Sequence, residues 1–308
     1  MRRWPSSRKL RLRSHDLRLA HGRVTLPPFD LHRARSSDEA HELLERYGED
    51  AAVVCGGTEL LLLLKLGFAA YGHLVDIKRI DDLGGIRTES GSLVIGAIAT
   101  HREIERSPMV LERLPALAAM ACDVANTRVR NVGTLGGNLC FSDPHSDPAT
   151  FLLALDAEVD YDGGRMPLAE FLVGPYETAL RHGQLLRAVR IPLPEAGTSV
   201  VHRKLSFHER PAATVTVALR TEGARVVDAR VAVGSVGPRA VRATAAAAAL
   251  LGKDAGDVDV FLEAGALAAE QSDAVEDANG SVEYKQQLVR VLVERCLMSA
   301  LADAEGIG

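Results

Sequence analysis

Two glycine-rich stretches decide the fold of this chain: Cys55-Gly56-Gly57-Thr58-Glu59-Leu60 and Thr134-Leu135-Gly136-Gly137-Asn138-Leu139. Each places paired glycines near a threonine. Glycine lets backbone N–H groups turn towards an anion and lets the anion approach without a Cβ in the way, and the threonine hydroxyl adds a donor. Two such stretches predict a diphosphate that is gripped from both sides, and a dinucleotide is the ligand that best fits this description.

Neither stretch is a standard nucleotide-binding motif. The first lacks the G-x-G-x-x-G spacing of a Rossmann turn and the Gly-Lys-Ser/Thr of a Walker loop. Taken alone, a Gly-Gly pair before a helix is more often a plain tight turn than a ligand site. The second stretch favours the ligand site, because it follows the basic segment Arg128 to Asn131 and runs into Asn138 and Asp147, which supply amide and carboxylate groups.

Hydrophobic periodicity and turn residues predict alternating strands and helices along most of the chain. We expect strands at 51–55, 74–77, 93–98, 158–161, 185–191, 200–205, 214–219 and 226–236. We expect helices at 37–47, 58–66, 149–155, 240–251, 258–271 and 282–302, and a helical stretch over 100–126 that is broken at Pro108 and Pro115. Thr58 is expected to cap the second helix, and residues 131–138 are expected to form a loop.

Composition and charge limit the class of protein. The chain has 308 residues, of which 47% are hydrophobic and 25% charged, as in an ordinary globular protein with room for two domains. The leucine run Leu60 to Leu66 is far shorter than the roughly 20 apolar residues of a membrane span, so no transmembrane segment is expected.

The charge is distributed unevenly. Residues 1–24 hold eight Arg or Lys against one Asp, a charge of +7, which leaves −12 for the remainder of a chain with net charge −5. We therefore predict a basic, disordered extension over residues 1–25, and an acidic body that does not bind nucleic acid over a broad surface.

The cysteines and acidic residues form no strong metal-binding pattern. The four cysteines, Cys55, Cys122, Cys140 and Cys296, form no C-x-x-C pair, so a structural zinc or iron–sulfur site is not expected. The basic residues 1–24 lack the apolar stretch of a signal peptide. This favours a cytoplasmic location, where the cysteine thiols would be reduced. Asp143, His145 and Asp147 form a weaker metal candidate, because prolines interrupt the segment and no fourth ligand is evident. A carboxylate would be repelled by phosphate, so Asp147 is expected to accept a hydrogen bond from a hydroxyl or imide N–H of the dinucleotide.

With these residues in view, the chain resembles the FAD-binding (medium) subunit of the molybdenum hydroxylases, the family of xanthine dehydrogenase, carbon monoxide dehydrogenase and 4-hydroxybenzoyl-CoA reductase. The resemblance covers about residues 26–302. The motifs that carry it are specific in combination and in order. They are Cys55-Gly-Gly-Thr-Glu-Leu60, Leu74-Val-Asp-Ile77, Ile95-Gly-Ala-Ile-Ala-Thr-His101, Arg130-Asn-Val-Gly-Thr-Leu-Gly-Gly-Asn138, Asp143 to Pro148, Gly174-Pro-Tyr-Glu177, Leu185-Leu-Arg-Ala-Val-Arg-Ile-Pro192 and Arg203-Lys204.

The resemblance implies an α+β fold with two domains. Residues 26–195 would form a two-lobed FAD-binding domain, and residues 198–305 a small C-terminal domain with a three-stranded antiparallel sheet and helices. It also implies which residues bind the cofactor. The two glycine stretches would hold the diphosphate and ribityl chain through Cys55, Gly56, Gly57, Thr58, Glu59, Leu60, Thr134, Leu135, Gly136, Gly137 and Asn138.

Three further residues match FAD contacts of the family. Asp147 matches an FAD-contacting aspartate, Leu186 an apolar contact, and Lys204 the lysine beside the isoalloxazine. A cation there stabilises the reduced flavin, which is anionic around N1 and C2=O. Without the resemblance, Lys204 reads more simply as a solvated strand lysine.

The function implied is that of an electron-transfer subunit. FAD on this chain would take electrons from a 2Fe-2S small subunit, which receives them from a large subunit with the molybdenum cofactor, and would pass them to an external acceptor. No catalytic residue and no metal are expected on this chain. Two alternatives are a self-contained flavin oxidase or dehydrogenase and a non-redox assembly protein of the same fold.

The chain departs from the family pattern in two places. Some relatives of the 4-hydroxybenzoyl-CoA reductase type insert cysteines for an extra iron–sulfur cluster after the second glycine stretch, whereas Leu139 here runs directly to Asp143, so no cluster is expected. After Lys204, many members have an Arg-x-Gly-Asp-Phe-Ala type segment, whereas this chain has His208-Glu-Arg-Pro-Ala-Ala213. The second departure leaves the electron acceptor open.

Overall fold

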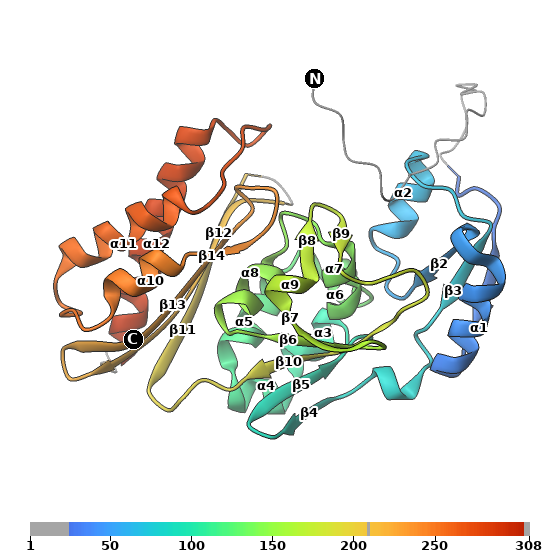
Figure 1. Cartoon of the computed structure of the whole chain (residues 1–308), viewed down its shortest axis with the longest axis horizontal. Helices are drawn as coiled ribbons and strands as arrows, with labels where there is room; N and C mark the ends of the chain where they lie inside the picture. Colours follow the sequence, from blue (N-terminus) through green and yellow to red (C-terminus); the bar gives the residue numbers. More distant parts are fainter. Residues whose placement is uncertain (1–24, 208–209, 305–308) are drawn as a thin grey trace. The chain divides into compact units, whose positions relative to one another are not determined.

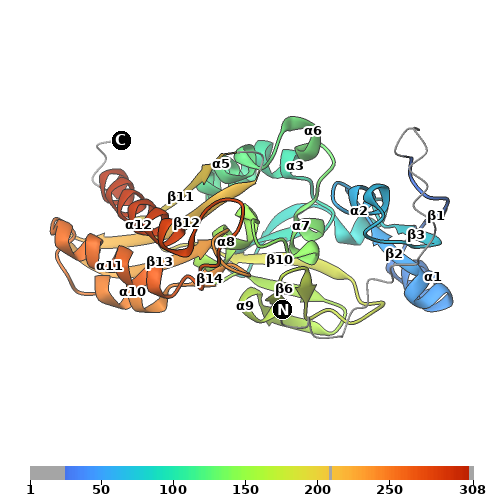
Figure 2. The same ribbon diagram turned by 90° about the horizontal axis from the view of Figure 1, so that it is seen from above.

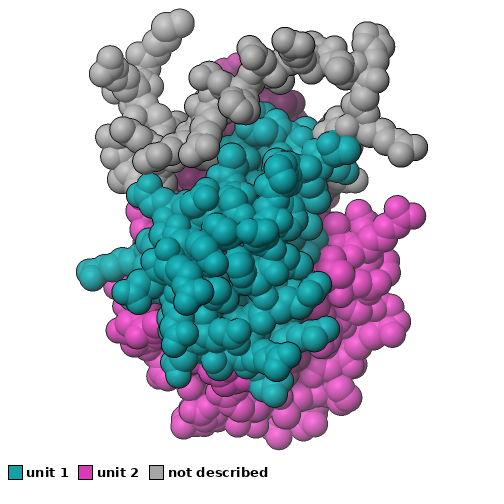
Figure 3. All heavy atoms as spheres, turned by 90° about the vertical axis from the view of Figure 1, so that its right-hand side faces the viewer, with its two compact units in different colours: residues 1–81, 181–184 teal, residues 82–180, 185–308 magenta. Residues whose placement is uncertain are grey.

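The computed structural model of the chain describes residues 25–207 and 210–304. The predicted basic extension, apart from its last residue, lies outside this range. The chain divides into two compact units, residues 1–81 with 181–184 and residues 82–180 with 185–308 (Figure 3). We call them unit 1 and unit 2 and describe each by itself.

Unit 1 is a small α/β lobe with a parallel sheet in the strand order β1-β3-β2 (Figure 1). Its elements are β1 (Asp30–Arg33), α1 (Ser37–Tyr47), a 3-10 turn (Gly48–Asp50), β2 (Ala51–Val54), α2 (Leu60–Leu66) and β3 (His73–Asp76). Ser36 caps α1 by accepting from the N–H of Glu39, as the acidic first turn predicts. Leu64 and Leu74 pack with Val54 in the core of the lobe, which fixes the turn between β2 and α2.

The first part of unit 2 is an antiparallel sheet covered by helices, in the strand order β4-β5-β10-β6-β7. The strands are β4 (Ile86–Glu89), β5 (Ser92–Gly96), β6 (Glu158–Tyr161), β7 (Gly164–Pro167) and β10 (Leu186–Pro192), with a separate hairpin of β8 (Leu172–Gly174) and β9 (Glu177–Thr178). The helices are α3 (His101–Arg106), α4 (Pro108–Arg113), α5 (Pro115–Asp123), α6 (Thr127–Arg130), α7 (Leu135–Phe141), α8 (Asp147–Ala154) and α9 (Leu168–Phe171). Pro108 and Pro115 stand at the starts of α4 and α5, so the predicted breaks are confirmed.

The second part of unit 2 is an antiparallel sheet in the order β11-β12-β13-β14. Its strands are β11 (Thr198–Ser206), β12 (Pro211–Glu222), β13 (Arg225–Gly234) and β14 (Val241–Arg242), and its helices are α10 (Thr244–Leu250), α11 (Val258–Glu270) and α12 (Val282–Ala304). The predicted antiparallel sheet with helices is confirmed, but the two-residue β14 adds a fourth strand to the three that were predicted.

The second sheet is covered on both faces. Helices α10, α11 and α12 lie on one face, and α5 and α8 lie on the other (Figures 1 and 2). The central strand β12 is therefore buried over nine consecutive residues from Pro211 to Leu219. No helix of the described residues is long and apolar enough to cross a membrane.

Candidate functional site

The first glycine stretch forms the turn between β2 and α2 in unit 1. Gly57 has a φ of 69°, which favours glycine, and a Cβ there would lie 3.0 Å from Leu61. Among the described residues, the N–H groups of Gly56, Gly57 and Thr58 have no hydrogen-bond partner. Three neighbouring unpaired N–H groups at a half-buried turn are what an anion cradle requires.

Thr58 does not cap the helix that follows. The N-cap of α2 is Glu59, and no side chain accepts from its first turn. The predicted capping by Thr58 is therefore wrong, because the turn continues through Thr58 and Glu59 before the helix begins at Leu60.

The second glycine stretch begins a helix rather than forming a loop. Thr134 is the N-cap of α7, and its Oγ1 accepts from the N–H of Gly137 at 3.1 Å. The N–H groups of Leu135, Gly136 and Asn138 donate to the carbonyls of Ala99, Ala97 and Thr134 at 2.9, 3.0 and 2.9 Å. The predicted loop over 131–138 is wrong from Leu135 onward, and the backbone N–H groups of residues 135–138 donate within the protein.

The two glycines of α7 serve different purposes. Gly136 is buried, and a Cβ there would lie 2.6 Å from the carbonyl oxygen of Ala97. Gly136 thus lets the helix approach the segment after β5 closely. Gly137 is exposed, and a Cβ there would meet only Thr134 Oγ1, at 2.8 Å. Gly137 therefore leaves open surface over the first turn of α7.

Asp147 and Lys204 form an ion pair in unit 2. Asp147 is the first residue of α8 and is buried, and its Oδ2 lies 2.7 Å from Lys204 Nζ. Lys204 Nζ also donates to the carbonyl of Asp123 at 2.6 Å. Lys204 is therefore not a freely solvated strand lysine, and two residues predicted to contact the same cofactor contact each other.

The N-terminus of α8 is tied to α7. Ser146 caps α8 by accepting from the N–H of Ala149, and its Oγ donates to Asn138 Oδ1 at 2.6 Å. Asn138, Asp147 and Lys204 are thus joined through a short series of contacts. The six candidates from Cys55 to Leu60 belong to unit 1, and those from Thr134 onward belong to unit 2.

Leu186 lies in the hydrophobic core of unit 2, at the start of β10, and is only 4% exposed. Its pairing with β6 contains an irregularity between Leu186 and Ala188. The structure therefore gives Leu186 a packing role, and its surface available to a ligand is small.

His202 and His101 were not among the predicted site residues. His202 Nε2 lies 3.7 Å from Asp147 Oδ1, and its ring is buried. His101 is the first residue of α3 and is also buried, which lowers its pKa to about 4 even though the charge of Asp147 opposes the shift. His202 could have been found from the sequence, because it stands two residues before Lys204 on a strand and therefore shares its face.

The basic and acidic residues near the second glycine stretch pair within the protein. Arg130 donates to Glu105 at 3.2 Å and to the carbonyl of Val124 at 3.2 Å. Asp143 accepts from the backbone N–H of His145 at 2.9 Å and pairs with Arg210 at 2.5 Å. Within the part of the chain that the structure describes, no group of three His, Cys, Asp or Glu residues could hold a metal ion.

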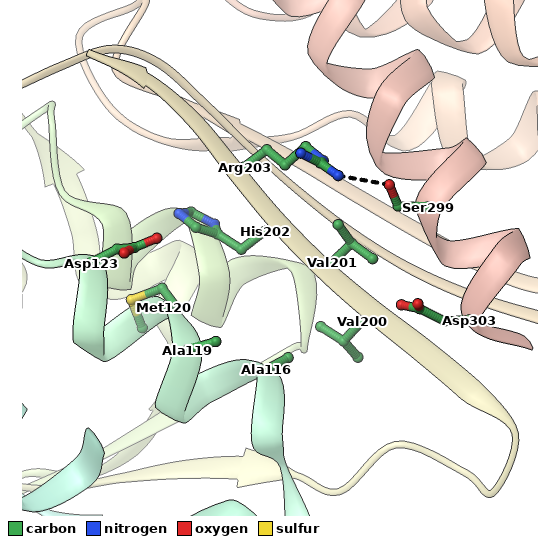
Figure 4. Close-up of a pocket in the computed structure, with 10 residues that line it drawn as sticks. All are labelled: Ala116, Ala119, Met120, Asp123, Val200, Val201, His202, Arg203, Ser299 and Asp303. Carbon is green, nitrogen blue, oxygen red and sulfur yellow. Dashed lines mark hydrogen bonds between the residues drawn. The ribbon is translucent and has the colours of Figure 1, made fainter. Parts of the chain in front are cut away.

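A pocket of about 340 Å³ lies between α5, β11 and α12. It is lined by Ala116, Ala119, Met120, Asp123, Val200, Val201, His202, Arg203, Ser299 and Asp303. Figure 4 shows His202 extending from β11 towards α5 and Arg203 extending the other way to Ser299, as expected for neighbours on a strand. None of the predicted cofactor-binding residues lines this pocket, but His202 connects it to Asp147.

Two family models match the chain in succession. The FAD binding domain in molybdopterin dehydrogenase matches residues 27–194, and the CO dehydrogenase flavoprotein C-terminal domain matches residues 203–300. The carbon monoxide dehydrogenase medium chain of Hydrogenophaga pseudoflava is 35% identical over 282 residues, which are 90% of this chain and 98% of that protein. The 6-hydroxypseudooxynicotine dehydrogenase complex subunit alpha of Paenarthrobacter nicotinovorans is 32% identical, over 89% of this chain and 95% of that protein.

Solved structures give the same result. Carbon monoxide dehydrogenase from Hydrogenophaga pseudoflava, in a form that lacks the Mo-pyranopterin moiety, contains a chain with a TM-score of 0.86 and 36% identity. The match covers 90% of this chain and 99% of that one. A chain of quinoline 2-oxidoreductase from Pseudomonas putida 86 has a TM-score of 0.85 and 29% identity, over 92% of this chain and 99% of that one.

Proposed function

The chain belongs to the family of FAD-binding medium subunits of the molybdenum hydroxylases, and from this premise we propose that it binds FAD and transfers electrons within such a complex. The observation that carries the proposal is the match over 98% of the Hydrogenophaga pseudoflava medium chain, which includes both domains in order. The electrons would come from a 2Fe-2S small subunit, supplied by a large subunit with the molybdenum cofactor, and would leave to an external acceptor. The match of residues 203–300 to a flavoprotein C-terminal domain disfavours a self-contained flavin oxidase, which would need a domain for its own substrate.

The residues of unit 1 suit the diphosphate of FAD. The unpaired N–H groups of Gly56, Gly57 and Thr58 can donate to phosphate oxygens, and the left-handed backbone at Gly57 turns the segment as such a cradle needs. We assign Cys55 to Leu60 to this role.

The residues of unit 2 also suit FAD, and Thr134 to Asn138 are proposed for its diphosphate and ribityl chain. Bound FAD supplies the redox chemistry. Gly137 keeps the surface over α7 open for close approach. Asp147 is a carboxylate, which can accept a hydrogen bond from a hydroxyl or imide N–H of the cofactor. Lys204 holds a positive charge beside Asp147, which would favour an anionic reduced flavin. We assign Thr134 to Asn138, Asp147 and Lys204 to the cofactor, and Leu186 to the apolar packing behind it.

The organisation of the chain and its location complete the proposal. We place the FAD-binding domain at residues 26–195 and the C-terminal domain at 198–305, which the two family matches support. The location we propose is the cytoplasm, where the partner subunits would be assembled.

The test is FAD retention by the purified chain, alone and with its partner subunits. We expect a flavin band near 450 nm that acid releases as FAD, and we expect iron–sulfur absorption from chains that co-purify. Gly137→Val should abolish FAD retention by filling the open surface, whereas Gly256→Val, at another exposed glycine, should not. A wild-type chain that stays colourless after addition of FAD would refute the proposal, and normal flavin in Gly137→Val would refute the role of Gly137.

A further inference from the structure

The carboxylate of Asp147 lies between two side chains of β11. Its Oδ2 pairs with Lys204 Nζ at 2.7 Å, and its Oδ1 faces His202 Nε2 at 3.7 Å. The side chain of Asp147 is 6% exposed and that of His202 is 4% exposed. Neither Asp147 Oδ1 nor His202 Nε2 has a hydrogen-bond partner among the described residues. Because unpaired buried polar atoms are costly, this pair calls for an explanation.

The separation of 3.7 Å restricts what can satisfy the two atoms. It is longer than a hydrogen bond, but it is shorter than the ~4.5 Å that separates two atoms bridged by a water at ordinary hydrogen-bond distances and angle. Each atom is therefore the nearest available partner of the other. A small rotation of the carboxylate closes the contact.

The other nitrogen of His202 decides which proton the ring carries. His202 Nδ1 lies 2.8 Å from Thr216 Oγ1, and the two residues stand opposite each other on β11 and β12. If Nδ1 accepts from the Thr216 hydroxyl, the neutral ring carries its proton on Nε2 and presents a donor to Asp147. The opposite tautomer would place a lone pair against a carboxylate oxygen. The ring of Phe151, edge-on at 6.1 Å, packs against His202 and limits its rotation.

We propose that His202 is a positioning residue for Asp147: it donates from Nε2 to Oδ1, in a tautomer selected by Thr216. With Lys204 on one oxygen and His202 on the other, the carboxylate has one orientation in which it meets the cofactor. This inference rests on the proposed function, in which Asp147 contacts FAD. It assigns to His202 a role that neither the glycine stretches nor the family resemblance indicates.

Three substitutions of His202 distinguish the contribution of Nε2 from that of Nδ1. His202→Gln places an amide N–H near the position of Nε2, His202→Asn places one only near Nδ1, and His202→Leu removes both. We expect the Kd for FAD to be about tenfold higher or more in the Leu and Asn variants, because the hydrogen bond to the charged carboxylate of Asp147 is lost. The Gln variant should stay within about threefold of wild type, since its amide replaces that bond.

The control is Ser272→Ala, which removes a buried hydroxyl just after α11 that donates to the carbonyl of Ala269 at 2.7 Å. The Kd of this variant should equal that of the wild type even though a buried hydrogen bond is lost. If the control weakens FAD as much as His202→Leu does, or if the Asn variant binds like the Gln variant, the positioning role of His202 is overturned.

A second readout requires no cofactor. Nitrogen-15 NMR of the cofactor-free chain with labelled histidines reports which nitrogen of His202 is protonated. We expect a proton on Nε2 in the wild type and a mixture of tautomers in Thr216→Val. A neutral ring protonated only on Nδ1 would overturn the inference whatever the affinities are. If the wild type binds no FAD, the proposed function fails, and this measurement still decides the tautomer.

Discussion

The adjacent glycines of α7 should respond differently to alanine. In Gly136→Ala, the new Cβ would lie 2.6 Å from the carbonyl oxygen and 2.9 Å from the Cα of Ala97, so backbone must shift. Overpacking costs about 1–3 kcal/mol, and we take the upper end because the atoms that are met belong to the backbone. Alanine is favoured over glycine in a helix by ~1 kcal/mol, which leaves a net loss of about 2 kcal/mol.

In Gly137→Ala, the only close atom is the capping Thr134 Oγ1 at 2.8 Å. Displacing this cap costs about 1 kcal/mol, and the helix preference of alanine offsets it by a similar ~1 kcal/mol. The expected net change in the free energy of unfolding is close to zero.

Thermal denaturation of the cofactor-free chain, followed by circular dichroism, measures this difference. At about 2–4 °C per kcal/mol for a unit of this size, Gly136→Ala should lower the Tm by roughly 4–8 °C, whereas Gly137→Ala should stay within about 2 °C. Gly256→Ala is the control, because its Cβ would meet only Asp254 Oδ1 at 3.4 Å. Equal losses in the two α7 variants would refute the distinction between a packed and an open glycine.

Three further predictions concern buried groups of unit 2. Lys285 is fully buried and pairs with Asp277 at 2.7 Å. Asp277→Asn leaves this buried charge unpaired and should lower the free energy of unfolding, measured by urea denaturation, by about 3–5 kcal/mol, whereas Lys285→Met should change it by about 1 kcal/mol or less. Similar losses in the two variants would contradict this reasoning. Burial lowers the pKa of His101 from 6.5 to about 4. Because the unfolded chain takes up this proton first, the free energy of unfolding should fall by up to about 3 kcal/mol between pH 6.5 and 4, and the fall should be smaller in His101→Gln. Burial also raises the pKa of the Cys296 thiol to about 12. A thiol reagent should therefore modify the exposed Cys122 and leave Cys296 intact until the protein unfolds. Labelling of Cys296 in the folded protein would show that its burial is incomplete.

The family could be predicted from the resemblance that the ordered motifs carry. Most regular elements could be predicted from apolar periodicity, which reports on buried faces, and from proline positions, which mark helix starts. The predicted helix 37–47 and strand 158–161 coincide with α1 and β6. The strand β1 was missed because Asp30–Arg33 is a polar edge strand without apolar alternation. The short β7 was missed for a related reason, since Gly164–Pro167 has an exposed, turn-like sequence.

The two glycine stretches show where composition misleads. Both contain paired glycines and a threonine, but the order differs: Thr58 follows its glycines, whereas Thr134 precedes Gly136 by two residues. Only the second order allows the hydroxyl to cap a helix that contains the glycines. The ion pair of Asp147 with Lys204, and the contact of Asp147 with His202, depend on the packing of α8 against β12 and β13, next to β11, which no local pattern of sequence reveals.

The helices that pack on the two faces of the sheet β11-β12-β13-β14 are made at different times, which affects how the chain folds during synthesis. One face of β12 packs on α8, which precedes it, but the other face packs on α12, which is made much later. Between Glu222 and Ala304 the ribosome adds about 80 residues, which takes roughly 4–16 s at about 5–20 residues per second. During that interval the strand presents valine and alanine side chains on an uncovered face. A nascent chain of this kind offers chaperones a binding surface that disappears when α12 docks.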